Sequence, residues 1–125
     1  MHELSVCQGL IRQVEGIARQ EGATQVDSIM LSIGPLSGVE PPLLGRAFEI
    51  ARMGTVAQNA ELEIETGPIV VECRTCGSRG EASVNRLLCP ACGDWRVRVR
   101  QGEEMILMRV ELSGIPETQA AAEQM

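Results

Sequence analysis

The sequence predicts an α+β fold in which a small sheet of about three strands with two helices is interrupted by an inserted cysteine-rich module. Three observations support this fold class. Apolar residues recur at helical spacing in two segments, they alternate with polar residues in three others, and four of the five cysteines lie in two short repeats. At 125 residues with 44% hydrophobic side chains, the chain has enough apolar surface for one modest core.

The first two elements are a helix and a strand. A helix is predicted over 4–20, where apolar side chains recur every three or four residues and Gly22 follows as a stop signal. Its apolar positions are Leu4, Cys7, Ile11, Val14 and Ala18. A strand is predicted over 26–33, where alternate residues are apolar. This strand ends at a Gly-Pro pair, which begins a turn-rich segment over 34–40.

Three more elements complete the predicted α+β domain. Pro41 and Pro42 suit the first turn of a second helix, which Gly54 ends. Its buried face is expected to comprise Leu44, Ala47, Phe48 and Ala51. The alternating segments 61–66 and 104–112 are predicted to be strands. The apolar face of the last strand is expected to comprise Ile106, Met108, Val110 and Leu112.

These elements divide the chain into three parts. Residues 1–68 and 103–112 are predicted to form the α+β domain, and 69–102 a metal-binding module inserted into it. Residues 113–125 have no apolar face to bury and are expected to form a flexible tail.

The composition excludes several classes of protein. All 11 basic residues are arginine, the 17 acidic residues give a net charge of −6, and the only aromatic residues are Phe48 and Trp95. Nucleic-acid-binding proteins are usually basic and supply stacking aromatics, so this class is disfavoured. The longest apolar run, 105–108, is too short for a membrane span, and the N-terminus lacks the features of a signal peptide. A cytoplasmic location is therefore expected, where structural disulfides are rare.

The four paired cysteines predict a closed metal site. Cys73 and Cys76 form one Cys-x-x-Cys-Gly repeat, and Cys89 and Cys92 form the second, twelve residues further on. Two such turns place four thiolates around one point, as in a zinc ribbon, and Zn²⁺ prefers this ligand set. Because the protein fills all four positions, the zinc is expected to be structural. A single rubredoxin-type iron and a pair of redox-active dithiols are the alternatives.

The N-terminus offers a second group of metal ligands. His2 is the only histidine of the chain. The amine of Met1, the amide nitrogen of His2 and the imidazole of His2 can close two adjacent chelate rings on one ion. Such a nitrogen-rich, near-planar set suits Ni²⁺ or Cu²⁺. The alternative is a histidine without a ligand role, either at the surface or with its hydrogen bonds satisfied in the core.

Several segments together resemble one protein family. These are MHELS at 1–5, SIMLSIGPLSGVEPPLLGRAFEIA at 28–51, Gly54-Thr55, AELEIE at 60–65 and the paired cysteines. They look like the HypA/HybF hydrogenase nickel-incorporation proteins, over about residues 1–112. The resemblance implies a metallochaperone that delivers Ni²⁺ to the large subunit of [NiFe]-hydrogenase and works with the GTPase HypB.

The resemblance also implies which residues bind metal. It assigns nickel to His2 with the backbone nitrogens of Met1, His2 and Glu3. It assigns zinc to Cys73, Cys76, Cys89 and Cys92. Some relatives have a second histidine after the cysteine module that helps to bind nickel. In this chain Arg96, Arg98 and Arg100 occupy that region, and no second histidine is present.

Other residues give no sign of catalysis. The sequence contains no recognisable nucleophile–base pair or phosphate-binding loop, so the protein is not expected to be an enzyme. Cys7 lies on the apolar stripe of the first helix and is expected to be a buried free thiol. Arg96, Arg98 and Arg100 would share one face of a strand, where solvent exposure or contact with an acidic partner is expected. A zinc-ribbon adaptor for nucleic acid or protein, and a redox protein, remain the alternative functions.

Overall fold

The computed structural model describes residues 2–115 and contains two compact units. We call these units 1 and 2 and describe each by itself. Among the described residues, unit 1 comprises 2–31, 40–63 and 107–115. Unit 2 comprises Ser32–Val39 and Ile64–Ile106. The expected module, 69–102, lies within the range Ile64–Ile106 of unit 2. Its exact boundaries, between 68 and 69 and between 102 and 103, stay a prediction.

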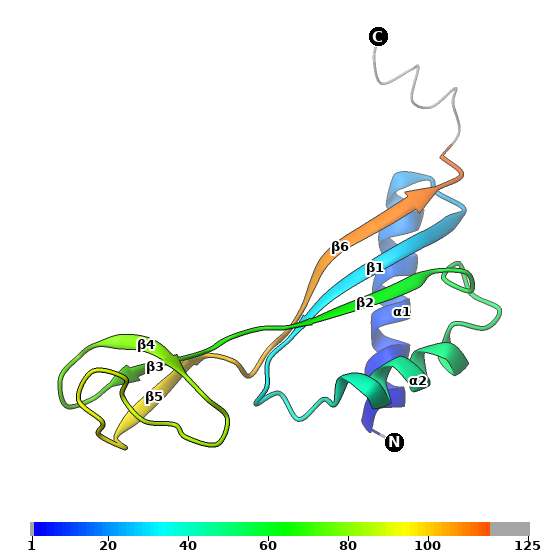
Figure 1. The fold of residues 1–125 in the computed structure, drawn as a ribbon. Coiled ribbons are helices and arrows are strands. Elements are labelled where there is room, and N and C mark those ends of the chain that lie inside the picture. The colour runs from blue at the N-terminus through cyan, green and yellow to red at the C-terminus, as the bar shows by residue number, and fades with distance from the viewer. Residues whose placement is uncertain (1, 116–125) are drawn as a thin grey trace, which may run out of the picture. The chain divides into compact units, whose positions relative to one another are not determined.

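The two predicted helices are present in unit 1 (Figure 1). Helix α1 spans His2–Glu21, two residues more at its start than the apolar spacing indicates. His2 and Glu3 carry no apolar side chain, so the apolar spacing cannot reveal them as helical. Helix α2 spans Pro41–Ala51, with proline in its first turn as predicted.

Apolar side chains of the two helices and of strand β1 form the core of unit 1. Strand β1 spans Gln25–Ile33, and its buried positions include Val26, Ile29 and Leu31. The buried residues of the helices are Cys7, Leu10, Ile11, Val14, Ala18, Leu44 and Phe48. Ala47 and Ala51, which were expected on the buried face of α2, are half-buried. Burying a large side chain such as Phe48 stabilises the fold by about 1.5–3 kcal/mol.

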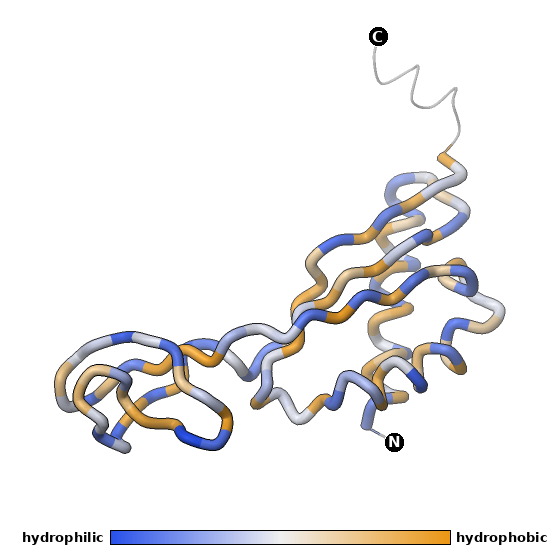
Figure 2. The backbone as a smooth tube through the Cα atoms, in the orientation of Figure 1, coloured by the Kyte–Doolittle hydropathy of each residue, from blue (hydrophilic) through white to orange (hydrophobic). Residues whose placement is uncertain are grey.

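Strand β1 is the central strand of a three-stranded sheet. The order is β2-β1-β6, with β2 at Glu61–Thr66 and β6 at Met105–Ser113. Figure 2 shows hydrophilic and hydrophobic positions alternating along β2, as its sequence predicts. The expected strand count and the two helices confirm the predicted α+β class.

The expected burial of the last strand is wrong in part. Ile106 is 45% exposed and Met108 is 51% exposed, whereas Val110 and Leu112 are half-buried. Met105 and Leu107, which alternate with these two residues, are half-buried, so the shielded side of β6 changes between the first and second halves of the strand. Ser113, which was assigned to the tail, is the last residue of β6, and residues 116–125 lie outside the described part of the chain.

Unit 2 contains a second three-stranded sheet of order β4-β3-β5 (Figure 1). Strand β3 spans Ile69–Cys73, β4 spans Arg79–Ala82 and β5 spans Val97–Gln101. Strand β3 pairs antiparallel with both neighbours. The buried side chains of these strands are those of Ile69, Val71 and Cys73, so the sheet is buried on one side only.

A close backbone contact joins two segments of unit 2 that are far apart in the sequence. The amide of Gly34 donates to the carbonyl of Glu104 at 2.8 Å, and the amide of Leu36 donates to the carbonyl of Gly102 at 2.8 Å. A Cβ at Gly34 would lie 2.2 Å from the carbonyl oxygen of Gly102. Only glycine fits at position 34, because any side chain would collide with that backbone.

No helix in the described part of the chain is both long enough and apolar enough to cross a bilayer.

Candidate metal centre

The first cysteine repeat forms a tight turn at the end of strand β3. The backbone amides of Thr75 and Cys76 donate to Sγ of Cys73 at 3.3 and 3.4 Å. The amide of Gly77 donates to the carbonyl of Cys73 at 3.1 Å, with a φ of 78° at Gly77. Glycine adopts this left-handed conformation without the steric cost that a side chain would impose. The turn therefore aims backbone amides at a cysteine sulfur.

The second repeat makes the same turn. The amides of Ala91 and Cys92 each donate to Sγ of Cys89 at 3.3 Å. The amide of Gly93 donates to the carbonyl of Cys89 at 2.9 Å, and its φ is 79°. The glycine that ends each Cys-x-x-Cys-Gly repeat is therefore the residue that indicates the shape of the turn in the sequence.

The two turns bring four sulfur atoms together. Sγ of Cys73 lies 3.6 Å from Sγ of Cys92, and Sγ of Cys76 lies 3.5 Å from Sγ of Cys89. All four sulfurs lie within 4.8 Å of one another, and all four thiols are free. With Zn–S bonds of about 2.3 Å, a tetrahedral site separates its sulfurs by about 3.8 Å. The cluster therefore has the donor set and the spacing that fit a structural Zn²⁺.

The pKa values of the thiols differ widely within this cluster. Hydrogen bonds from the side chain and amide of Ser78 lower the pKa of Cys76 to about 6. The amide of Cys76 is the main cause of a lowered pKa at Cys73. At Cys92 the amide of Asp94 lowers the pKa, but the neighbouring thiols and desolvation prevail and raise it to about 12. Because its pKa is raised, the Cys92 thiol does not ionise near neutral pH unaided, whereas a divalent cation displaces the proton of a thiol that it binds.

A polar contact that the sequence analysis missed joins the two turns. The hydroxyl of Thr75, in the first turn, donates to the carboxylate of Asp94, just after the second. The amide of Arg96 also donates to this carboxylate, at 3.1 Å. These two donors, with the hydroxyl of Thr75 as the larger cause, lower the pKa of Asp94. An aspartate directly after the second Cys-x-x-Cys-Gly repeat is the signal that could have indicated this contact.

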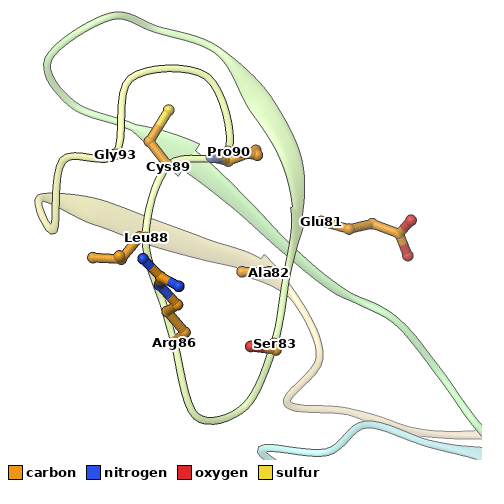
Figure 3. Close-up of a pocket in the computed structure, with 8 residues that line it drawn as sticks. All are labelled: Glu81, Ala82, Ser83, Arg86, Leu88, Cys89, Pro90 and Gly93. Atoms are coloured by element: carbon orange, nitrogen blue, oxygen red, sulfur yellow. The ribbon is translucent and has the colours of Figure 1, made fainter.

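A pocket of about 390 Å³ lies beside the second turn (Figure 3). Its lining includes Ala82, Ser83, Arg86, Leu88 and Pro90. Cys89 also lines the pocket, although 97% of its surface is buried, so the pocket ends at the metal cluster. The four thiolates can fill the coordination sphere of a bound Zn²⁺, so the site does not need the pocket as an entry for a fifth ligand.

The proposed nickel ligands are at the start of helix α1. His2 is the first residue of the helix and is exposed, and Glu3 is half-buried. The first amides of a helix have no carbonyl partner within it, so backbone nitrogens are accessible here. Met1 lies outside the described residues. Among residues 2–115, the four-cysteine cluster is the only close group of three or more metal-ligating side chains, and His2 does not belong to it.

Cys7, the fifth cysteine, is a buried free thiol, as predicted. It is 0% exposed, and its Sγ contacts the carbonyl oxygen of Leu44 at 3.4 Å. Burial, with a smaller effect of the Glu3 carboxylate, raises its pKa to about 11. A thiol that stays protonated inside the core is a packing group and not a metal ligand.

Comparison with known proteins identifies relatives along nearly the whole described chain. The profile of the HypA family, described as hydrogenase/urease nickel incorporation and metallochaperone, matches residues 1–112. The hydrogenase maturation factor HypA of Nitrosospira multiformis is 51% identical over 112 residues, which are 90% of this chain and 97% of the relative. HypA of Aquifex aeolicus is 41% identical, with the same coverage of both chains.

Solved structures agree with these sequence matches. The solution structure of the nickel metallochaperone HypA from Helicobacter pylori has a TM-score of 0.69 and 28% identity, covering 90% of this chain and 97% of that one. A second solution structure of a HypA protein has a TM-score of 0.70 and 29% identity, covering 91% and 98%. The fold described above is therefore shared with proteins of the matched family.

Proposed function

The chain belongs to the HypA family of hydrogenase and urease nickel-incorporation metallochaperones, and we propose that it holds its Ni²⁺ cargo at its N-terminus. It is a nickel metallochaperone for hydrogenase maturation. The proposed ligands are the imidazole of His2 and the backbone nitrogens of Met1, His2 and Glu3. The observation that carries this proposal is the position of His2, exposed at the first residue of α1.

The start of a helix has two opposite effects on a bound cation. The amide nitrogens of the first turn have no hydrogen-bond partner within the helix, so a metal ion can reach them. The helix dipole, however, places partial positive charge at this end, which repels cations. Backbone nitrogens bind Ni²⁺ strongly only after they lose their protons, and that loss supplies compensating negative charge. The carboxylate of Glu3, in the first turn, adds to it. Binding is therefore expected to rearrange the first turn of α1 and to release protons.

We propose that the four-cysteine cluster holds a structural Zn²⁺. The ligands would be Cys73, Cys76, Cys89 and Cys92, which supply four thiolates and leave no position for water or substrate. The metal would cross-link the two turns. It would not take part in handling nickel.

We propose the GTPase HypB and the hydrogenase large subunit as partners, and the cytoplasm as the location. The family supports the partners, because a maturation factor must pass its metal to another protein. Free thiols at all five cysteines support a reducing compartment. We further propose that the chain has no catalytic activity of its own and acts by binding and transfer.

Nickel titration of the full chain tests the proposed site. His2→Ala and a variant with three extra residues before Met1 should each weaken nickel binding by at least about tenfold, or 1.4 kcal/mol. The first removes the imidazole, and the second converts the Met1 amine into an amide. Isothermal titration calorimetry measures the affinity, and both variants should keep their zinc content and unfolding temperature.

Ser5→Ala is the matched control, because Ser5 is exposed in the same turn and supplies no proposed ligand. It should bind nickel as tightly as the unmodified chain does. Tight one-site binding by the extended chain would exclude the amine as a ligand. Unchanged binding by His2→Ala would overturn the site.

A further inference from the structure

The sheet of unit 2 places three arginines around one glutamate on a single face. In the antiparallel register, Glu72 of β3 lies opposite Arg79 of β4 and opposite Arg98 of β5. Residues paired in this way direct their side chains to the same side of a sheet. Arg100 of β5 reaches the same glutamate by hydrogen bonds. We call these four residues the arginine face.

The opposite side of this sheet is the buried one. Val71 and Cys73, which flank Glu72 in β3, are 0% and 3% exposed. Side chains alternate along a strand, so the arginine face is directed away from this core. Arg79 and Arg98 are accordingly exposed.

Glu72 holds two of the arginines in place. Its Oε1 accepts from Nε of Arg79 at 2.9 Å and from Nε of Arg100 at 3.1 Å. Its Oε2 accepts from Nη2 of Arg100, also at 3.1 Å. Among the described residues, Arg98 has no ion pair. One carboxylate therefore orients two guanidinium groups, and a third remains available beside them.

This local positive charge contrasts with the rest of the molecule. Unit 2 contains six arginines and six carboxylates, so the formal charge of −6 is carried by the rest of the chain. The arginine face gathers three of these six arginines around one of the six carboxylates. Such a patch attracts negatively charged groups over a distance of about one Debye length, roughly 8–10 Å.

We propose that the arginine face is a docking surface for an acidic segment of a partner protein. Arginine binds carboxylates through two parallel hydrogen bonds, and all the cations of this face are arginines. Glu72 keeps two of them ordered before binding, which lowers the conformational entropy lost on binding. Arg98 supplies a third guanidinium, which forms no ion pair with a carboxylate of the described residues.

Protein carboxylates fit this surface better than nucleic acid does. Three exposed arginines give few phosphate contacts, and the net charge of −6 opposes a long polyanion. The arginine face also has no aromatic side chain for base stacking, since Phe48 is buried in unit 1 and Trp95 precedes β5. This surface is separate from the proposed nickel ligands in the sequence, so its test does not depend on the nickel site.

The experiment uses the full chain with the metal that it carries, and an eight-residue polyglutamate peptide as the probe. Two-dimensional NMR at about 20 mM salt should show binding, with shifts concentrated on β3, β4 and β5, and about 150 mM salt should weaken it. Arg98→Glu should weaken binding at least about fivefold, the scale of an exposed ion pair. Arg86→Glu is the matched control, since it makes the same charge change in unit 2 but lies in the loop after β4.

Three results would overturn the proposal. Equal weakening by Arg98→Glu and Arg86→Glu would mean that the peptide responds to total charge and not to the arginine face. A DNA duplex of equal charge that binds tighter than the peptide would assign the surface to nucleic acid. No binding of polyglutamate at low salt would exclude an acidic partner. Zinc content measured on each variant shows whether unit 2 is intact.

Discussion

At the scale of single residues, the hydrogen-bonding partner of the sulfur separates two buried cysteines. Cys7 and Cys89 are both almost fully buried, yet they have different surroundings. The sulfur of Cys89 accepts hydrogen bonds from two backbone amides and lies in the four-cysteine cluster, whereas the sulfur of Cys7 donates to a carbonyl oxygen. The hydrogen-bonding partner, more than the burial, separates a candidate ligand from a packing residue.

The raised pKa of Cys7 predicts a loss of stability in alkaline solution. Its pKa is about 11 in the folded chain, against an ordinary value of 9.0. The folded state therefore keeps the proton that the unfolded state loses, and stability falls as the pH rises from about 9 to about 11. Urea unfolding at several pH values measures this loss, which Cys7→Ala should not show. An equal alkaline loss in both proteins would contradict the raised pKa.

At the scale of elements, the shape of each cysteine turn depends on the backbone angle φ of the glycine that ends it. Gly77 has open space around its missing Cβ, so an alanine there would meet no neighbour. Its φ of +78° is nevertheless a conformation that side chains disfavour. The cost of a substitution therefore comes from the backbone and not from packing.

Gly77→Ala should accordingly destabilise unit 2 by about 1–2 kcal/mol and speed the release of its metal to a chelator. Gly16→Ala is the matched control, because Gly16 also has open space but lies within helix α1. It should stabilise the chain by about 0.5–1 kcal/mol. Thermal unfolding and metal release, followed with a coloured chelator, distinguish the two variants. Equal effects of both substitutions would show that φ is not the determinant.

At the scale of the whole molecule, the two units obtain their stability from different sources. Unit 1 has a continuous apolar core from two helices and a strand. Unit 2 buries few side chains, and two of them are the cysteines Cys73 and Cys89. We therefore expect unit 2 to depend on a bound metal for its fold, since a structural Zn²⁺ contributes about 10–16 kcal/mol of binding free energy.

Removal of the metal ligands should therefore unfold unit 2 alone. Cys73→Ala combined with Cys76→Ala should abolish the one zinc expected per chain and the hydrogen-exchange protection of β3, β4 and β5. Amides of α1 and α2 should stay protected. Elemental analysis and hydrogen exchange by NMR measure both effects, and Cys7→Ala should keep its zinc. Zinc that survives the double substitution would disprove the ligand assignment.

The sequence by itself determined the parts that rest on local signals. Apolar spacing located both helices within two residues, alternation located the strands of the first sheet, and the repeated Cys-x-x-Cys-Gly pattern identified the four cysteines that cluster. These signals are local because helix and strand periods and a tight turn each involve only a few neighbouring residues. The resemblance to the HypA family rests on the same motifs.

Tertiary structure alone decided which strand faces are shielded and which polar residues meet. Alternation placed Ile106 and Met108 on the same apolar face as Val110 and Leu112, but the half-buried positions change side along β6, which leaves the first two exposed. Likewise, the contact of Thr75 with Asp94, nineteen residues apart, depends on how two turns close on one point. The pairing of Glu72 with Arg100 depends on strand register, which adjacent residues in the sequence do not encode.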